Sequence, residues 1–220
     1  MINKRVLLLC GHYGSGKTNI AVNLAQQIKR EYPTVTLADL DIVNPYFRSK
    51  DSAPELEEAG IRLICSRYAN SNVDIPALPP DLYALTDDRQ MRAIIDVGGD
   101  DRGALVLGRL APAILSENDY EMMMVINCYR PLTRDAASTL EVMREIETAG
   151  GIRFTALINN SNLGAETTAK DVLASMSYAE EVEAMSNLPL VMTTADERLQ
   201  DELKDKITNL FPLKLQKKIQ

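Results

Sequence analysis

A glycine-rich octapeptide near the N-terminus constrains this chain more than any other stretch. It reads Gly-His-Tyr-Gly-Ser-Gly-Lys-Thr over residues 11–18, after the apolar run 6–10 and before apolar residues at helical spacing. This order fits G-x-x-x-x-G-K-[ST] between a strand and a helix, the phosphate-binding P-loop. Glycines let successive backbone N–H groups point at one phosphate, and the helix that follows adds its positive dipole end. The stretch therefore predicts a strand–loop–helix unit that binds a nucleoside phosphate.

The residue types inside the octapeptide suggest particular roles. Lys17 can reach the β- and γ-phosphates, and the Thr18 hydroxyl can ligate Mg²⁺. We expect the loop and the next helical residue to contact the nucleotide: Gly11, His12, Tyr13, Gly14, Ser15, Gly16, Lys17, Thr18 and Asn19. The alternative is a glycine-rich turn that binds nothing.

The composition indicates one globular domain over residues 1–220. Of the 220 residues 45% are hydrophobic and 25% charged, and the net charge of −7 gives no reason to expect binding to nucleic acid over the whole surface. The three cysteines lack C-x-x-C spacing and are expected to be buried, reduced thiols. A secretory signal and an apolar stretch long enough to span a bilayer are both missing, so we expect a cytoplasmic protein.

Apolar runs alternate with amphipathic stretches along the chain. Strands are expected at about 35–39, 61–65, 91–97, 122–127, 154–159 and 188–192. Helices are expected at about 54–59, 104–115, 136–150, 172–185 and 197–210, with Pro112 ending or kinking the second of these. Solid apolar strands separated by helices favour a three-layer α/β/α P-loop NTPase fold with a mostly parallel central sheet.

Polar residues gather at the predicted carboxyl ends of these strands. Ligands of open parallel sheets bind beyond that edge, so we expect the polar side chains to surround the nucleotide together with the P-loop. The polar side chains are those of Asp39, Asp41, Asp96, Asn127, Asn159 and Asn160, and Gly99 lies among them with its backbone N–H.

Carboxylates in this set suit a magnesium site. Asp96 fits a Walker B role, holding Mg²⁺ through a water, because Mg²⁺ keeps much of its hydration shell. Asp39 and Asp41 point the same way if the strand continues, so one can join the magnesium shell while the other orients the attacking water. Gly99 completes D-x-x-G and can offer its N–H to the γ-phosphate. The alternatives are two solvated carboxylates and a plain Gly-Gly turn.

The P-loop, the Asp-Leu-Asp at 39–41 and the Asp-x-x-Gly at 96–99 together resemble the MinD/ParA-type ATPases, over about residues 4–192. That group includes the nitrogenase iron protein and the ATPases that target arsenicals and tail-anchored proteins or mature metal centres. The resemblance implies Mg²⁺-dependent binding of ATP and ADP, with slow hydrolysis. It also implies that Asp41 positions the hydrolytic water, that Asp39 and Asp96 support Mg²⁺, and that Asn160 bonds the adenine edge. Asn159 is the rival for the adenine.

The resemblance further implies a conformational switch. ATP binding in the family drives a face-to-face homodimer, and hydrolysis resets two loops, here about 41–51 and 98–104, that serve a protein or metal-cofactor partner. Where the family P-loop begins Lys-Gly, this chain has His12 and Tyr13. Arg48, Arg102 and Arg130 are candidates for the positive charge that the family's lysine supplies across the dimer.

Other function classes stay open. A P-loop small-molecule kinase usually carries an arginine-rich lid, whereas residues 167–183 hold one Lys and no Arg. A nucleotide-binding regulator with negligible turnover is a further alternative. A GTPase is disfavoured because residues 159–162 do not read N-K-x-D. The apolar and basic tail at 211–219 is expected to pack on the domain or stay solvated rather than to bind a membrane.

Overall fold

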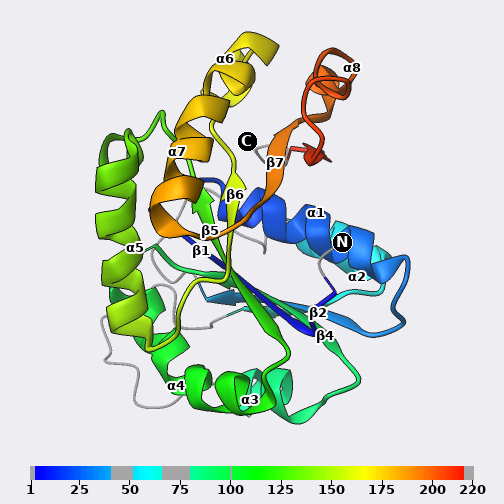
Figure 1. Ribbon diagram of the computed structural model, residues 1–220. Helices are drawn as coiled ribbons and strands as arrows, with labels where there is room; N and C mark the ends of the chain where they lie inside the picture. The colour runs from blue at the N-terminus through cyan, green and yellow to red at the C-terminus, as the bar shows by residue number, and fades with distance from the viewer. Residues whose placement is uncertain (1–2, 41–51, 66–79, 100, 216–220) are drawn as a thin grey trace.

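The computed structural model describes residues 3–40, 52–65, 80–99 and 101–215 (Figure 1). Eight strands of this part of the chain form one sheet in the order β3-β2-β4-β1-β5-β6-β7-β8, and all neighbouring strands run parallel. They are β1 (Val6–Cys10), β2 (Val35–Leu40), β3 (Arg62–Cys65), β4 (Arg92–Val97), β5 (Tyr120–Ile126), β6 (Ala156–Asn159), β7 (Leu190–Asp196) and β8 (Leu210–Leu213). The predicted α/β class with a parallel sheet is confirmed.

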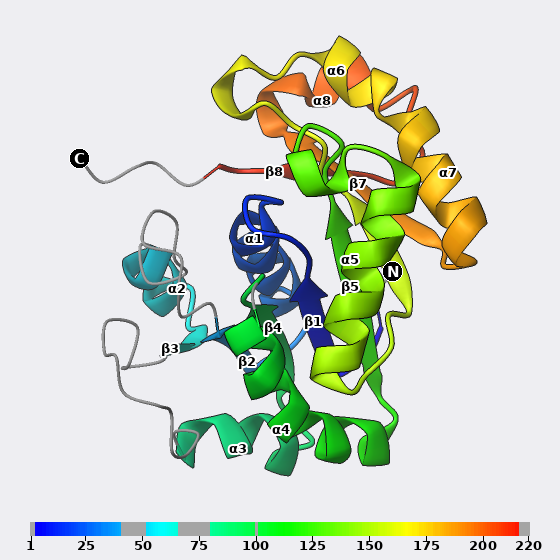
Figure 2. The ribbon, with the colours of Figure 1, turned by 90° about the vertical axis from the view of Figure 1, so that its left-hand side faces the viewer.

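Helices cover both faces of the sheet (Figures 1 and 2). One face packs against α1 (Lys17–Lys29) and α2 (Ala53–Glu58). The other packs against α3 (Pro80–Asp87), α4 (Asp101–Glu117), α5 (Ala136–Gly150) and α7 (Met176–Ser186). A smaller core joins α6 (Ala169–Ala174), α8 (Gln200–Leu203) and the end of β7. Short 3₁₀ turns complete the described elements: η2 (Pro131–Thr133), η3 (Gly164–Glu166) and η4 (Glu197–Leu199).

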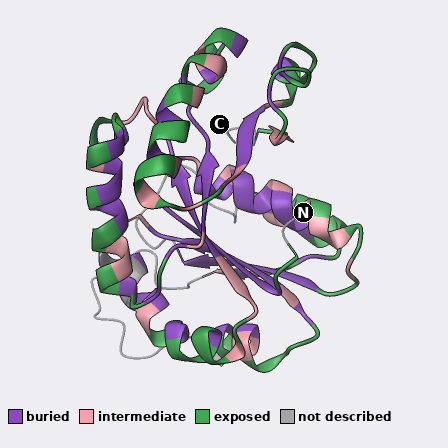
Figure 3. Cartoon of the chain, in the orientation of Figure 1, coloured by how far each residue is buried: buried purple, intermediate pink, exposed green. Residues whose placement is uncertain are grey.

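Strand β1 shows why the strands are uniformly apolar. Leu7 and Leu9 belong to the core against α1, whereas Val6, Leu8 and Cys10 belong to the core against α4 and α5. All five are buried, and Figure 3 shows the same along most of the central strands. Because helices cover both faces, neither side of such a strand favours a polar residue.

One ion pair is buried at the amino end of the sheet. Arg5 is 4% exposed and pairs with the carboxylate of Glu117 at the end of α4. The guanidinium also donates to the carbonyl oxygens of Leu85 (2.9 Å), Asp88 (3.1 Å) and Met91 (3.1 Å). The hydrogen bonds from Arg5 hold the pKa of Glu117 below its ordinary value. This arginine therefore ties the start of β1 to α3, α4 and the α3–β4 connection.

Of the two outcomes expected at Pro112, an end or a kink of the helix, the first is wrong for α4. It runs from Asp101 to Glu117 with Pro112 inside. Leu110 and Ala111 before the proline and Ile114 after it are all buried in the core. Burial of the apolar face on both sides of the proline offsets the backbone hydrogen bond that proline cannot make.

The stretch predicted as one helix at 172–185 forms two helices, α6 and α7. Ser175 lies between them, donates to the Val172 carbonyl (2.7 Å) and accepts from the Asn159 amide (2.9 Å). The break between α6 and α7 therefore lies at a serine whose hydroxyl is held by two buried hydrogen bonds.

The helix predicted at 197–210 ends at Leu203, half-way along the predicted stretch. Only η4 and α8 are helical there, and Leu210–Leu213 adds strand β8 to the open edge of β7. Asn209 starts the pairing, since its side-chain amide donates to the Leu190 carbonyl (2.9 Å) and its backbone carbonyl accepts from Thr193 N (3.0 Å).

Among the described helices none is long and apolar enough to cross a membrane.

The cysteines are free thiols, but only one is fully buried. Cys10 lies in the core, where burial raises the pKa of its thiol, and Cys65 and Cys128 are half-buried. The expectation of buried thiols therefore holds for Cys10 alone.

Candidate functional site

The P-loop connects β1 to α1 at the carboxyl edge of the sheet. Gly14 and Gly16 have φ of 76° and 90°, in the left-handed region that favours glycine. A Cβ on Gly11 would lie 2.5 Å from the carbonyl oxygen of Val125. Gly16 is the N-cap of α1, and no described side chain caps that helix. The loop thus needs its glycines and leaves the N-terminus of α1 to an anion.

Two polar side chains inside the loop fit a phosphate. The Lys17 ammonium is buried and donates to the carbonyls of Gly11 (3.0 Å) and His12 (3.4 Å). The Ser15 hydroxyl is buried without a hydrogen-bond partner among the described residues. A buried hydroxyl without a partner costs free energy, and a phosphate oxygen in the loop would supply the missing bond.

Thr18 links the P-loop helix to the end of β4. Its hydroxyl donates to Asp96 Oδ2 at 2.7 Å. Asp96 is fully buried, Asp39 is 6% exposed, and the two are register partners on neighbouring strands β2 and β4. Adjacent buried carboxylates favour a shared cation, and hydroxyl and carboxylate oxygens are the ligands that Mg²⁺ prefers. The residues therefore fit a magnesium ion.

The protein supplies only part of a metal shell. Within the described ranges no cluster of three or more His, Cys, Asp or Glu side chains is placed to hold a metal. Mg²⁺ usually keeps several waters and shares substrate phosphates, so two carboxylates and a hydroxyl are a sufficient protein contribution.

The loop after β4 lies directly against the P-loop. A Cβ on Gly99 would come within 2.7 Å of both Gly11 O and Tyr13 N. Only glycine permits this approach of two backbones. The structure thus places the D-x-x-G glycine against the P-loop. Its contact with a γ-phosphate stays a prediction.

The three asparagines at the strand ends differ in their contacts. Asn127 accepts from the backbone N–H groups of Tyr129 (3.0 Å) and Asn162 (3.3 Å). Asn159 donates to Ser175 and accepts from Ser161 N (3.1 Å). Both are fully buried in internal contacts. The Asn160 amide instead donates to Ser15 O in the P-loop at 2.6 Å.

Comparison with solved structures identifies the architecture. FtsY, a cell division protein from Thermotoga maritima, matches with a TM-score of 0.58 and 17% identity, over 90% of this chain and 64% of that one. The signal recognition particle receptor FtsY from Elizabethkingia anophelis, in complex with GDP, gives 0.53 and 18%, over 91% and 60%. The signal recognition particle 54 kDa protein from Aeropyrum pernix K1, also with GDP, gives 0.51 and 18%, over 86% and 41%.

This chain has the P-loop NTPase fold. It spans less than two thirds of the length of each of those structures, and at such low identity the likeness concerns the fold. No family model matches the chain, and neither does any curated protein.

Arg130 is one of the three arginines considered as a source of the positive charge that the family's lysine supplies. In this P-loop NTPase fold it lies at the P-loop. Its Nε donates to Gly14 O at 2.9 Å, from the loop after β5. His12 is half-buried with Nδ1 3.0 Å from Tyr13 O, and Tyr13 is 48% exposed. Asp41, Arg48 and the predicted switch at 41–51 lie outside the described residues, as does the side chain of Arg102.

Helix α1 also meets the C-terminal strand of this P-loop NTPase fold. The Asn23 amide donates to Asn19 O (2.8 Å) and to Lys214 O (3.1 Å), and its oxygen accepts from Lys214 N (2.9 Å). The predicted nucleotide contact Asn19 thus lies one helical turn from this junction.

Sequence reasoning missed Thr194, in the carboxyl-terminal half of β7. Its hydroxyl donates to the oxygen of the Asn160 amide at 2.6 Å. Thr193 and Thr194 are polar residues that follow directly on the apolar strand predicted at 188–192, the same signal that had pointed to Asp96 and Asn159.

Proposed function

We propose that this protein is a Mg²⁺-dependent nucleotide switch of the MinD/ParA type that binds ATP and hydrolyses it slowly. The observation that carries the proposal is the 2.7 Å hydrogen bond from Thr18 to the buried Asp96. It unites the P-loop helix with the Walker B strand, the pairing that a nucleotide–magnesium site requires.

Different residues of this chain have different roles in the proposed nucleotide site. The backbone N–H groups of the P-loop and the N-terminus of α1 bind the phosphates, and Lys17 neutralises their charge. Thr18, Asp39 and Asp96 would hold Mg²⁺, which when bound neutralises charge developing on the phosphate oxygens. Asp41 orients the attacking water, and Gly99 responds to the γ-phosphate from its position against Gly11.

The proposal has two forms, which differ in whether the nucleotide base is adenine or guanine. ATP follows from the resemblance to MinD/ParA-type ATPases and from residues 159–162, which lack N-K-x-D. GTP is the second candidate because two structures of the same fold are complexes with GDP. Competition of unlabelled ATP and GTP against a fluorescent nucleotide decides between them.

Hydrolysis is tested with two site variants and one control. Lys17→Ala is expected to lower kcat on the order of 100-fold or more, because phosphate charge loses its counter-charge. Asp41→Asn is expected to keep nucleotide binding while turnover falls roughly 100-fold or more, because the water loses its orienting carboxylate. Lys29→Ala, at the far end of the same helix, is the matched control.

Phosphate release and nucleotide affinity are measured together. Full activity of Asp41→Asn removes the assigned role of that residue. Binding without phosphate release in the wild type indicates a regulator, and transfer of phosphate to a metabolite instead of water indicates a kinase.

We further propose that ATP drives a homodimer, with Arg130 supplying the positive charge that the family's lysine supplies. Light scattering with a non-hydrolysable ATP analogue is expected to show a dimer for the wild type and weaker dimerisation for Arg130→Ala. The control is Arg134→Ala, since that side chain is 77% exposed and pairs with Asp135. A wild-type protein that is monomeric both with and without the analogue rejects the dimer. The protein partner of the switch is sought separately, among proteins that co-purify with the ATP-bound form.

A further inference from the structure

The side chain of Asn160 uses both ends of its amide inside the protein. It is 4% exposed and follows directly after β6. Its Nδ2 donates to Ser15 O, and its Oδ1 accepts from Thr194 Oγ1, both at 2.6 Å. A carbonyl oxygen only accepts, so the orientation of the amide follows from Ser15: the flipped amide would face oxygen with oxygen. Thr194, Asn160 and Ser15 therefore form a continuous hydrogen-bonded chain from β7 to the P-loop.

The amide also supports the backbone at the start of α1. A Cβ on Gly16 would lie 2.2 Å from Asn160 Nδ2. Gly16 is the N-cap of α1 in a left-handed conformation, and Ser15 precedes it. Asn160 thus contacts the two residues whose backbone directs the helix N-terminus toward a phosphate.

We propose that Asn160 is a positioning residue for the phosphate cradle, acting through Ser15 and Gly16, and that it does not choose between adenine and guanine. The inference rests on the proposed nucleotide binding. A base edge needs accessible amide surface, and this amide is buried with a partner at each end. Its removal should weaken binding of the phosphates whatever base is attached to them.

The probes are ATP, GTP and inorganic tripolyphosphate, which carries no base. In Asn160→Asp the donor to Ser15 O is replaced by an oxygen, so affinity for all three probes is expected to fall by a similar factor, on the order of tenfold or more. Thr194→Val removes the hydrogen bond at the other end of the Asn160 amide without adding charge. It is expected to weaken the binding of all three probes to a smaller, equal extent.

Asn209→Asp is the matched control. The Asn209 amide also donates to a backbone carbonyl, that of Leu190 at 2.9 Å, at the β7–β8 edge. The same chemical change there is expected to lower thermal stability and leave the affinity for tripolyphosphate unchanged. This comparison separates a role in the cradle from a general loss of stability.

The outcomes are distinct. A changed ATP-to-GTP ratio with unchanged tripolyphosphate affinity makes Asn160 a base reader and overturns the inference. Unchanged affinity for every probe overturns it too. If Asn160→Asp does not fold, Thr194→Val decides by the same criteria. A wild-type protein that binds none of the probes refutes the proposed function instead.

Discussion

Gly16 and Gly151 both adopt left-handed backbone conformations, with φ of 90° and 65°, but their surroundings differ. A Cβ on Gly16 would meet the Asn160 amide at 2.2 Å, whereas a Cβ on Gly151 would meet no described atom within 4 Å. Alanine substitution at each of the two glycines therefore separates the cost of backbone strain from the cost of the close contact.

We predict that Gly16→Ala destabilises the protein more than Gly151→Ala does. The left-handed strain of about 1 kcal/mol is common to both, and so is the effect on the unfolded chain. The clash with an amide held by two hydrogen bonds adds roughly 1–3 kcal/mol at Gly16 alone. Urea unfolding measures the difference, and equal costs would show that the Asn160 amide moves aside freely.

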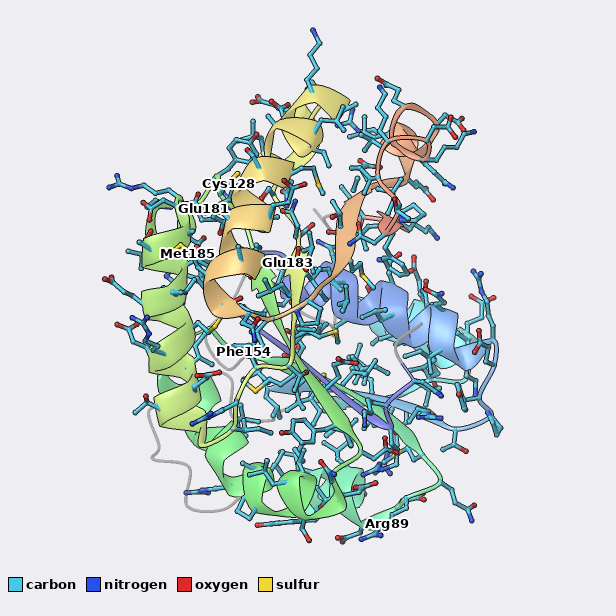
Figure 4. The ribbon with its side chains drawn as sticks, in the orientation of Figure 1. Arg89, Cys128, Phe154, Glu181, Glu183 and Met185 are labelled. Atoms are coloured by element: carbon cyan, nitrogen blue, oxygen red, sulfur yellow. The ribbon has the colours of Figure 1, made fainter. Side chains whose placement is uncertain are left out.

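At the scale of elements, two helices end in the same way. Four residues after Glu147, the left-handed Gly151 donates its N–H to the Glu147 carbonyl, and Asn187 does the same for Glu183. The carboxylates then accept backbone N–H groups seven residues on, Phe154 at 2.9 Å and Leu190 at 2.8 Å. Figure 4 labels Glu183 and Phe154 at these two turns. Each glutamate thus fixes how the chain leaves a helix and starts toward the next strand.

We predict that Glu147→Ala and Glu183→Ala each lower the free energy of unfolding by about 1–3 kcal/mol, because a backbone N–H loses its partner. Gln at either position keeps an acceptor and is expected to cost less. Glu181→Ala, at an exposed position of α7, serves as the control in the same urea titrations. Equal effects of Ala and Gln at position 183 would rule out the hydrogen bond as the cause.

At the scale of the whole molecule, the buried pair of Arg5 and Glu117 joins the start of β1 to the end of α4, and Arg5 also donates to a carbonyl of α3. We predict that Arg5→Met destabilises the fold by roughly 3–5 kcal/mol, because a carboxylate stays buried without its counter-charge. Three carbonyls also lose their donor. Arg153→Met, at an exposed position, is the control in denaturant unfolding. A cost below 1 kcal/mol would mean that water reaches Glu117.

The same pair predicts a pH dependence. The pKa of Glu117 is lowered in the folded state by Arg5, so its contribution is fully present above the ordinary glutamate pKa. That contribution is lost as the pH falls through the lowered pKa. The stability gap between wild type and Glu117→Gln should therefore narrow as the pH is lowered from 7 into the acid range. Thermal unfolding at stepped pH checks this, and a gap that stays constant would contradict the assignment.

Features set by neighbouring residues could be predicted from the sequence. The P-loop needs glycines at particular spacings because its backbone enters left-handed conformations, and such a requirement is visible in a single stretch. The parallel sheet was likewise predictable, since burial of both faces makes strands such as Val6–Cys10 uniformly apolar. The role of Asp41 at the attacking water stays a prediction. The contact of Asn160 with adenine that the resemblance implied is also untested, and the proposed role of Asn160 at the P-loop is the alternative to it.

Only the tertiary structure decided which distant residues meet. Asn160 reaches Ser15 across 145 positions and Arg130 reaches Gly14 across 116, because the strand order places β5 beside β1 and β6 next to β5. For the same kind of reason, helix α4 continues through Pro112, and the helix predicted at 197–210 stops at Leu203, ahead of strand β8. Packing of an apolar face and pairing with an open strand edge outweigh local preference. The sequence by itself therefore determined the phosphate loop and the class of fold, while the folded chain decided which side chains hold that loop in place.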